Sequence, residues 1–347
     1  MKTNFTNKRN SKLLIVAMAS TIVVAGLSAC TNNNNADSSG TPSPSSPSAA
    51  VSASPSASSS ATTAPTSGSE DGAILDAFKG KISEKASYAD LNAQLDADLP
   101  KVSKDTADEM LRQLLAYYET NLSEMQSSFE EEKLQQQLQK VQWPFTEDQL
   151  STIEDGAARE KVQAALDGGF KLETAEGFAF PVVDYGKLKR FDSYASPAMK
   201  DYVALLALES DQKRAADGGL TISWEELANR TLTAERFVKD YPDSPEKAKA
   251  TERYLLYLTN LLYGLDNTPI FDFDTYKVKP DITELYEKIV SENPDTATAK
   301  LAQEFLDVLA KTDGYVFRKG DSGGQSSIPE VQAFRDQLEE KAKSLLG

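Results

Sequence analysis

Apolar residues recur every three or four positions over much of this chain, and this spacing constrains the fold more than any other feature. Over residues 107–129 the apolar positions form one stripe: Ala107, Leu111, Leu114, Tyr118, Leu122, Met125 and Phe129. Steps of three and four lie on one face of an α-helix, so a long amphipathic helix is predicted here. Leu134 and Leu138 continue it with solvated Glu, Gln and Lys around them, until Trp143-Pro144 interrupts the pattern.

Helix starts can be recognised from their capping residues. Three pairs have the spacing of a capping box: Thr146 with Gln149, Ser223 with Glu226, and Asp281 with Glu284. Two apolar pairs, Phe145 with Leu150 and Ile222 with Leu227, are placed as hydrophobic staples. Ser196-Pro197 predicts a fourth start, whose apolar face is Met199, Tyr202, Val203 and Leu206. The helix after Ser223 is predicted to run to about Asp240, and the domain is predicted to be mainly α-helical.

One short region alternates with a period of two instead. Residues 170–172 and 178–182 predict a small β-hairpin, with Pro181 confined to an edge position. Aromatic residues follow it: Tyr185, Phe191, Tyr194 and Tyr202. They indicate either a binding groove or ordinary core packing, and packing is favoured because aromatics are the largest contributors to cores.

An eleven-residue pattern occurs twice, fifty-two residues apart. Residues 234–244 align without gaps on residues 286–296, with four identical and four conservative positions. In each copy a helix ends at a Pro-Asp turn whose Ser244 or Thr296 is placed to cap the next helix. The next helices carry apolar stripes of their own: Tyr254, Leu255, Leu258 and Leu262, then Leu301, Phe305 and Leu309. Each copy is predicted to be a helical hairpin.

The phrase from Phe237 to Ser244 resembles the junction between tetratricopeptide-like repeats of bacterial lipoproteins that act as assembly adapters. The resemblance implies stacked helical hairpins that bind other proteins. The period here is fifty-two residues, longer than the roughly thirty-four of that family, and the Trp-Leu-Gly-Tyr pattern of its first helix is missing. Two architectures therefore stay open, an irregular α-solenoid and a helical bundle.

Two residue types that many catalytic and metal sites need are scarce or missing. Cys30 is the only cysteine, and the chain has no histidine. An internal disulfide, a downstream thiol nucleophile and a Ser-His-Asp triad are excluded, and the commonest metal ligand is missing. We therefore predict no catalytic residue, no metal site and no cofactor.

The first thirty residues have the organisation of an export signal. Basic residues at positions 2, 8, 9 and 12 precede an apolar run over residues 13–27, and Leu27-Ser28-Ala29-Cys30 ends it. This pattern resembles the lipobox of bacterial lipoproteins. The resemblance implies cleavage after Ala29, a diacylglycerol on Cys30, and a location on the extracytoplasmic face of the cell membrane. A spanning anchor is the alternative, but fifteen residues make a helix of about 22 Å, short of the roughly 30 Å hydrocarbon core.

Composition divides the rest of the chain. Residues 31–70 are rich in Ser, Thr, Pro, Ala and Asn and predict a disordered tether, with 1–29 as signal peptide and 71–347 as the exported domain. The domain has possible halves at 71–218 and 219–347. Net charge is −16, and −20 once the four basic residues of the signal are removed, which disfavours nucleic acid as a partner.

Two motifs that could indicate chemistry are better explained as loops. Residues 320–324 read Gly-Asp-Ser-Gly-Gly, as around the nucleophile of trypsin-like proteases, but no histidine is present to take the serine proton. Asp272 and Asp274 have the spacing of calcium-loop ligands without that motif's glycine and distal glutamate.

These features together predict a membrane-anchored bacterial surface lipoprotein. Its domain is expected to bind or scaffold envelope proteins or cell-wall components without catalysis. A cell-wall hydrolase that uses two carboxylates and a solute-binding lipoprotein of a transporter stay open as alternatives. The second would need alternating strands and helices, which the pattern lacks.

Overall fold

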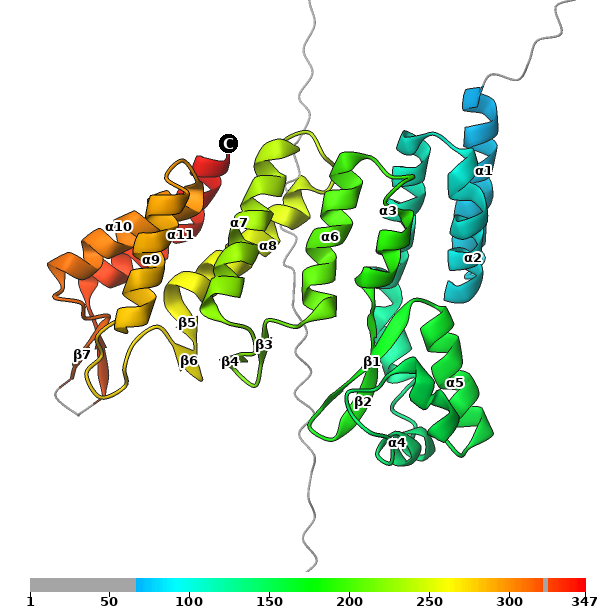
Figure 1. The fold of residues 1–347 in the computed structure, drawn as a ribbon, viewed down its shortest axis with the longest axis horizontal. Helices are drawn as coiled ribbons and strands as arrows, with labels where there is room; N and C mark the ends of the chain where they lie inside the picture. Colours follow the sequence, from blue (N-terminus) through cyan, green and yellow to red (C-terminus); the bar gives the residue numbers. More distant parts are fainter. Residues whose placement is uncertain (1–66, 321–323) are drawn as a thin grey trace, which may run out of the picture. The chain divides into compact units, whose positions relative to one another are not determined.

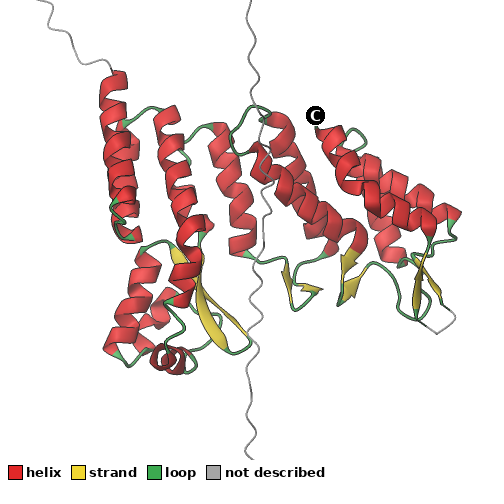
Figure 2. Cartoon of the chain, turned by 180° about the vertical axis from the view of Figure 1, so that it is seen from behind, coloured by secondary structure: helices red, strands yellow, loops and turns green. Residues whose placement is uncertain are grey.

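The computed structural model of the chain describes residues 67–320 and 324–347. These residues belong to one compact unit and are mainly α-helical, with strands only in small two-stranded antiparallel hairpins (Figure 1, Figure 2). The predicted fold class is confirmed. The predicted signal peptide, Cys30 and residues 31–66 of the predicted tether lie outside the described residues, and the division into halves at residue 218 stays a prediction.

The first part of the described chain consists of helices and one β-hairpin. Its elements are α1 (Ser67–Ser83), α2 (Tyr88–Asp98), η1 (Leu99–Lys101), α3 (Lys104–Ser127), α4 (Glu132–Leu138), η2 (Glu147–Thr152), α5 (Gly156–Asp167), β1 (Phe170–Ala175), β2 (Phe178–Val183), η3 (Tyr185–Phe191) and α6 (Pro197–Asp211). Helix α1 begins four residues before the predicted start of the domain at residue 71.

The second part is built from longer helices separated by short hairpins. Its elements are β3 (Ala215–Ala216), β4 (Gly219–Leu220), α7 (Trp224–Asp240), α8 (Lys247–Tyr263), β5 (Gly264–Leu265), β6 (Thr268–Pro269), α9 (Pro280–Glu292), α10 (Ala297–Lys311), β7 (Phe317–Lys319), β8 (Gln325–Ser327) and α11 (Pro329–Leu346). The structure thus adds three hairpins to the single one predicted.

The long amphipathic helix is confirmed as α3. The first four residues of its predicted stripe are at most 1% exposed, as is Phe129 just beyond its end. The helix does not continue into α4, since residues 128–131 between them are not helical. The prediction of solvated faces around Leu134 was wrong for Gln135, which is 5% exposed. The Gln135 amide donates to the Ala179 carbonyl at 2.7 Å and accepts from the Ala179 N–H at 2.9 Å, which ties α4 to β2.

Two of the predicted helix starts are confirmed in position and in hydrogen bonding. The Ser196 hydroxyl accepts from the N–H of Met199 at 3.2 Å, and the Ser223 hydroxyl accepts from the N–H of Glu226 at 3.1 Å. The capping box at Ser223 is only half formed. The Glu226 carboxylate accepts instead from Nε of Arg230 at 2.7 Å, because that buried cation lies one turn further along α7.

The other two starts differ from the prediction. Gln149 does accept from the N–H of Thr146 at 3.2 Å, but the element that begins there is the 3₁₀-helix η2. Asp281 was wrongly predicted as a cap. Pro280 takes the first helical position of α9, where its fixed φ and missing N–H are best tolerated, so Asp281 lies within the first turn.

The predicted hairpin is confirmed as β1 and β2, with Leu172 opposite Pro181. Its buried face packs on an aromatic cluster in which the Tyr118 and Phe170 rings are 5.3 Å apart and nearly perpendicular. The Tyr118 hydroxyl donates to the Gly168 carbonyl at 2.7 Å and accepts from Asn92 at 2.8 Å. Burial raises the pKa of Tyr118 to about 12. This cluster fixes the hairpin against α3.

The two copies of the repeat form the helical hairpins α7–α8 and α9–α10, as predicted. Thr296 caps α10 by accepting from the N–H of Ala299 at 3.0 Å. Ser244 does not cap α8. It accepts from the N–H of Glu246 at 3.2 Å within the turn, and α8 begins only at Lys247.

The short hairpins connect one helical pair to the next. The β3–β4 and β5–β6 hairpins are bonded to each other, since the N–H of Asn267 donates to the Gly218 carbonyl at 2.8 Å. The N–H of Leu220 also donates to the Thr268 hydroxyl at 3.0 Å. Gly218 has a φ of +71°, which its turn requires and which a side chain would strain. Consecutive helical pairs are therefore joined through their linkers as well as through their helices.

Candidate functional site

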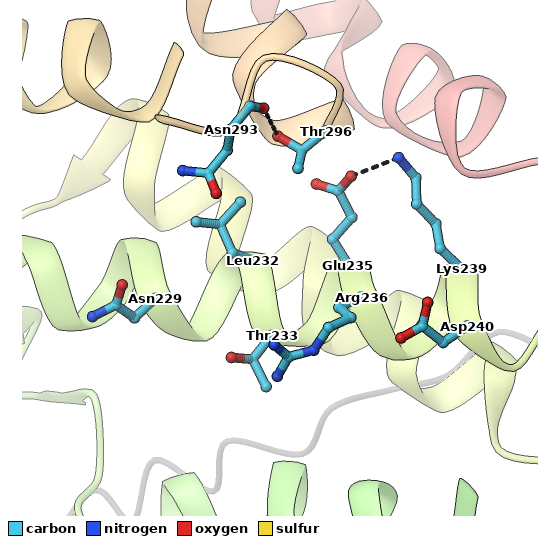
Figure 3. Close-up of a pocket in the computed structure, with 9 residues that line it drawn as sticks. All are labelled: Asn229, Leu232, Thr233, Glu235, Arg236, Lys239, Asp240, Asn293 and Thr296. Atoms are coloured by element: carbon cyan, nitrogen blue, oxygen red, sulfur yellow. Dashed lines mark hydrogen bonds and ion pairs between the residues drawn. The ribbon is translucent and has the colours of Figure 1, made fainter. Parts of the chain in front are cut away.

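A polar groove runs between α7 and α9, the first helices of the two repeat copies. It consists of two adjoining hollows of about 480 and 100 Å³, which share Asn229, Leu232 and Asn293. Figure 3 shows the larger hollow, in which the Leu232 side chain and the Asn293 amide point toward each other. Both residues are half-buried and form the floor.

The groove exists because α7 divides its two faces between core and solvent. Leu227, Ala234 and Phe237 lie on the buried face, at most 3% exposed. The opposite face presents Asn229, Thr233 and Arg236, one helical turn apart, along the groove. Helix α9 supplies the second wall with residues 285, 288, 289 and 292, one helical turn apart, and its C-cap Asn293 completes it.

Glu235 is the one deeply buried acid of the groove, with only 1% of its surface exposed. Its carboxylate accepts from the N–H of Ala297 at 2.6 Å and from the N–H and hydroxyl of Thr298 at 2.9 and 2.6 Å. Lys239 completes its surroundings with an ion pair at 2.8 Å (Figure 3). Glu235 thus closes the N-terminal end of α10, where backbone N–H groups have no intrahelical partner. Its hydrogen bonds make it a structural group of the groove wall.

The rim carries charges of both signs in equal number. Arg236, Lys239 and Lys288 are basic, and Glu225, Asp240 and Glu292 are acidic. The chain as a whole has a net charge of −16, so this face is far less negative than the average surface. The Asn229 amide has no hydrogen bond to another described residue, and its donor and acceptor face the solvent. The groove therefore offers donors, acceptors and charges along a line.

The described carboxyl groups with a clearly shifted pKa all have it lowered. For Asp272 the cause is hydrogen bonding, first from the N–H of Thr275. Hydrogen bonds from Ser103 lower the pKa of Asp71, and the ion pair with Lys133 lowers that of Asp155. In Glu109 burial acts in the opposite direction, but bonds from Gln113 and Arg112 outweigh it. A general acid near neutral pH would need a raised pKa, so these four groups do not have that property.

The acidic loop noted in the sequence is a hydrogen-bonded turn. One oxygen of Asp272 accepts from the N–H of Asp274 at 3.1 Å and from the N–H and hydroxyl of Thr275 at 2.9 and 3.0 Å. Within residues 67–320 and 324–347 no group of three or more acidic side chains is arranged to hold a metal ion.

The protease-like segment and the lipidation site give no geometry to test. Residues 321–323 lie outside the described part, and so does Cys30. The flanking Gly320 and Gly324 close the β7–β8 hairpin, since the N–H of Gly320 donates to the Gly324 carbonyl at 2.8 Å. None of the described helices is long and apolar enough to cross a membrane.

The aromatic residues that follow the β1–β2 hairpin were interpreted as core packing or as a binding groove, and the structure places them in both settings. Phe191 is buried and Tyr202 is 5% exposed, which is core packing. Tyr185 and Tyr202 also line a hollow of about 350 Å³ between α3, α6 and α8, together with Arg253 and the exposed Leu256. Burial raises the pKa of both tyrosines, so they stay neutral.

Comparison with protein families, with curated proteins and with solved structures found no match to this chain. The sequence prediction did not place any site residue in the groove. The signal that could have found it is the set of uncharged polar residues, Asn229 and Thr233, on the outer face of the first helix of a repeat. A purely solvated face would carry charges there instead.

Proposed function

We propose that this chain is a membrane-anchored bacterial surface lipoprotein whose domain binds an extended segment of another envelope protein in the groove between α7 and α9, without catalysis. The groove itself carries the proposal. Its floor of Leu232 and Asn293 is half-buried, and its rim offers charges of both signs and the free amide of Asn229. An extended backbone has donors and acceptors along its length that such a surface satisfies.

The arrangement of the hairpins supports binding along the groove. Helices α7 and α9 are the first helices of two successive pairs, and the surface between them continues from residue 225 to residue 240 of α7. A line of sixteen helical residues is about 24 Å long, enough for seven or so extended residues of a partner. Single exposed ion pairs contribute little, so affinity depends on several groups being engaged together.

Photocrosslinking tests the groove directly. A photoreactive residue at Thr233 or Lys288 should form adducts with an envelope protein in intact cells. The matched control is Glu287, which is exposed on α9 but does not line either hollow of the groove. We expect adducts from the two groove positions and at most about a tenth as much from position 287. Equal yields at all three positions would contradict the groove assignment.

Charge reversal gives a second readout. The double variant Arg236→Glu, Lys288→Glu removes two of the three basic groups of the rim and should weaken capture of that partner by about tenfold or more. The control, Lys104→Glu with Lys311→Glu, makes the same change of net charge at exposed sites elsewhere. A loss in both variants would indicate a non-specific charge effect.

Anchoring is proposed from Leu27-Ser28-Ala29-Cys30, where the thiol is the only site for a thioether-linked lipid. In cells fed a labelled fatty acid, Cys30→Ala should lose the label and leave the membrane fraction. A Cys30→Ala variant that keeps both would contradict the lipoprotein assignment.

The non-catalytic part of the proposal has its own test. The purified chain should hydrolyse neither peptide substrates nor cell-wall preparations, and Ser322→Ala should behave as the parent does. Hydrolysis that Ser322→Ala abolishes would overturn it.

A further inference from the structure

A second concavity lies on a different part of the molecule, where α11 meets the linker between α8 and α9. It has a volume of about 380 Å³, and its lining includes four aromatic rings, Arg335 and the polar residues Asp266 and Gln325. The Phe271 ring lies 5.4 Å from the ring of Phe273 and 5.3 Å from the ring of Phe317. Phe273 is 58% exposed, the highest value among the exposed large apolar residues of the described chain.

Arg335 holds the only guanidinium in this wall, and its surroundings are unusual for a cation. The guanidinium carbon lies over the Tyr263 ring at 4.8 Å and over the Phe317 ring at 5.2 Å. Its Nε is buried and has no hydrogen-bond partner. Among the described residues it forms no ion pair, whereas Arg112, Arg214 and Arg230 each pair with a glutamate.

The neighbouring acids do not take that role. Asp336 accepts from the Gln332 amide at 2.7 Å, and Asp266 lies exposed at the pocket rim. The Tyr263 hydroxyl donates to the backbone carbonyl of Arg335 at 3.3 Å and has no hydrogen bond with the Arg335 side chain. Burial lowers the pKa of Arg335, but a guanidinium remains protonated in proteins.

The guanidinium of Arg335 lacks one kind of partner, a carboxylate. Aromatic rings cover faces of the guanidinium, while its N–H groups lie in its plane and form a fork that matches the two oxygens of a carboxylate. A partly buried guanidinium without a counter-ion is costly, and a ligand carboxylate paired with it would lower that cost. The rings of Phe271, Phe273 and Phe317 would meet an apolar group attached to that carboxylate.

We propose that this pocket binds the C-terminal carboxylate of a polypeptide that ends in a large apolar residue. The carboxylate pairs with Arg335, and the last side chain packs against Phe271 and Phe273 at the mouth. This site is separate from the α7–α9 groove, so its failure leaves the groove proposal untouched.

Calorimetric titration of the full chain in detergent micelles tests the proposal. The probe is the peptide acetyl-Gly-Gly-Gly-Leu-Phe with a free C-terminus, and the comparison is the same peptide as a C-terminal amide. We expect the amide to bind at least about tenfold more weakly, since a charged hydrogen-bonded pair is lost. Equal affinity of the two peptides, or no saturable binding of the acid, would overturn the proposal.

Three variants locate the site. Arg335→Gln should reduce affinity for the acid at least about tenfold, and Phe273→Ala about threefold, as one apolar contact is removed. The matched control is Arg318→Gln, an exposed arginine on β7 that should leave affinity unchanged. Unchanged binding in Arg335→Gln would overturn the proposal. If Arg335→Gln does not fold, as judged by circular dichroism, the acid and amide comparison on the parent and the Phe273→Ala result still decide it.

The source of the carboxylate is decided by one more titration. N-acetyl-phenylalanine carries the same carboxylate and ring without a peptide backbone. Binding at least about tenfold weaker than that of the peptide would support a polypeptide C-terminus. Equal affinity would overturn that part of the proposal and point to a small aromatic acid.

Discussion

The hairpins α7–α8 and α9–α10 share a turn in sequence, yet each uses the turn to contact a different neighbour. In the first, Glu246 in the turn is only 6% exposed and accepts from Nε of Arg112 on α3 at 2.6 Å. In the second, the aligned residue is Thr298, which donates to Glu235 on α7 at 2.6 Å. The acid thus stands on the turn in one copy and on the neighbouring helix in the other.

The difference shows what the repeat conserves and what it does not. Both turns must satisfy the free N–H groups at the start of the next helix, and both lie where a helix from earlier in the chain packs. Either partner can supply the charge. The residue of α9 that aligns with Glu235 is Glu287, which is exposed.

The largest effect is expected from Glu235→Gln. The amide nitrogen would face N–H donors of Ala297 and Thr298 that now bond a carboxylate, so we expect a loss of about 3 kcal/mol in the free energy of unfolding. Urea denaturation measures it. Glu287→Gln is the repeat-matched control and should stay within about 0.5 kcal/mol of the parent. Equal losses in the two variants would mean that Glu235 and Glu287 contribute alike to stability, which would contradict the difference between the two repeat copies.

A smaller loss is expected from Arg112→Met, which removes the charged partner of Glu246. Glu246 keeps its bond from the Ser244 hydroxyl at 2.7 Å, so we expect about 2 kcal/mol in the same measurement. Adding Glu246→Gln to Arg112→Met should recover part of that loss, since no unpaired charge then remains buried. Additive losses in this double-mutant cycle would contradict a direct Arg112–Glu246 coupling.

The helix starts of the two copies should differ by less. Ser223→Ala removes the cap of α7 and should cost about 1 kcal/mol. Asp281→Ala removes only a favourable charge in the first turn of α9 and should cost about 0.3 kcal/mol. Chemical denaturation of the two variants measures both losses of unfolding free energy. A larger loss for Asp281→Ala than for Ser223→Ala would mean that Asp281 does cap α9.

The smallest effect is expected at Glu109, which shares Arg112 with Glu246 of the α7–α8 hairpin, and this effect depends on pH. Arg112 also bonds Glu109, and this bond lowers the pKa of that carboxyl group against the effect of burial. A lowered folded-state pKa contributes stability above about pH 4.3 that is lost as the pH falls through the folded-state value. Glu109→Gln should therefore lose about 0.3 kcal/mol at pH 6 and less at pH 3, measured by denaturation at both values. A loss that grows toward pH 3 would reverse the sign and contradict this origin.

Local pattern was enough to predict most of the helices and the β1–β2 hairpin. The stripe on α3, the cap at Ser223 and the Pro-Asp turns each depend on residues within a few positions of one another, and that range is what periodicity and capping report. The sequence also determined, by composition alone, that no internal disulfide and no histidine chemistry are available.

Tertiary structure decided everything that depends on partners far apart in the chain. Gln135 is buried because Ala179 lies opposite it, and Glu246 and Glu235 find their partners 134 and 62 residues away. The groove needs the outer faces of α7 and α9 side by side, and the Arg335 pocket needs α11 against the α8–α9 linker. A polar residue on a helix has the same local pattern whether it faces solvent or a distant carboxylate. Only the packing of the helices distinguishes the two, because the energy lies in the contact and not in either residue alone.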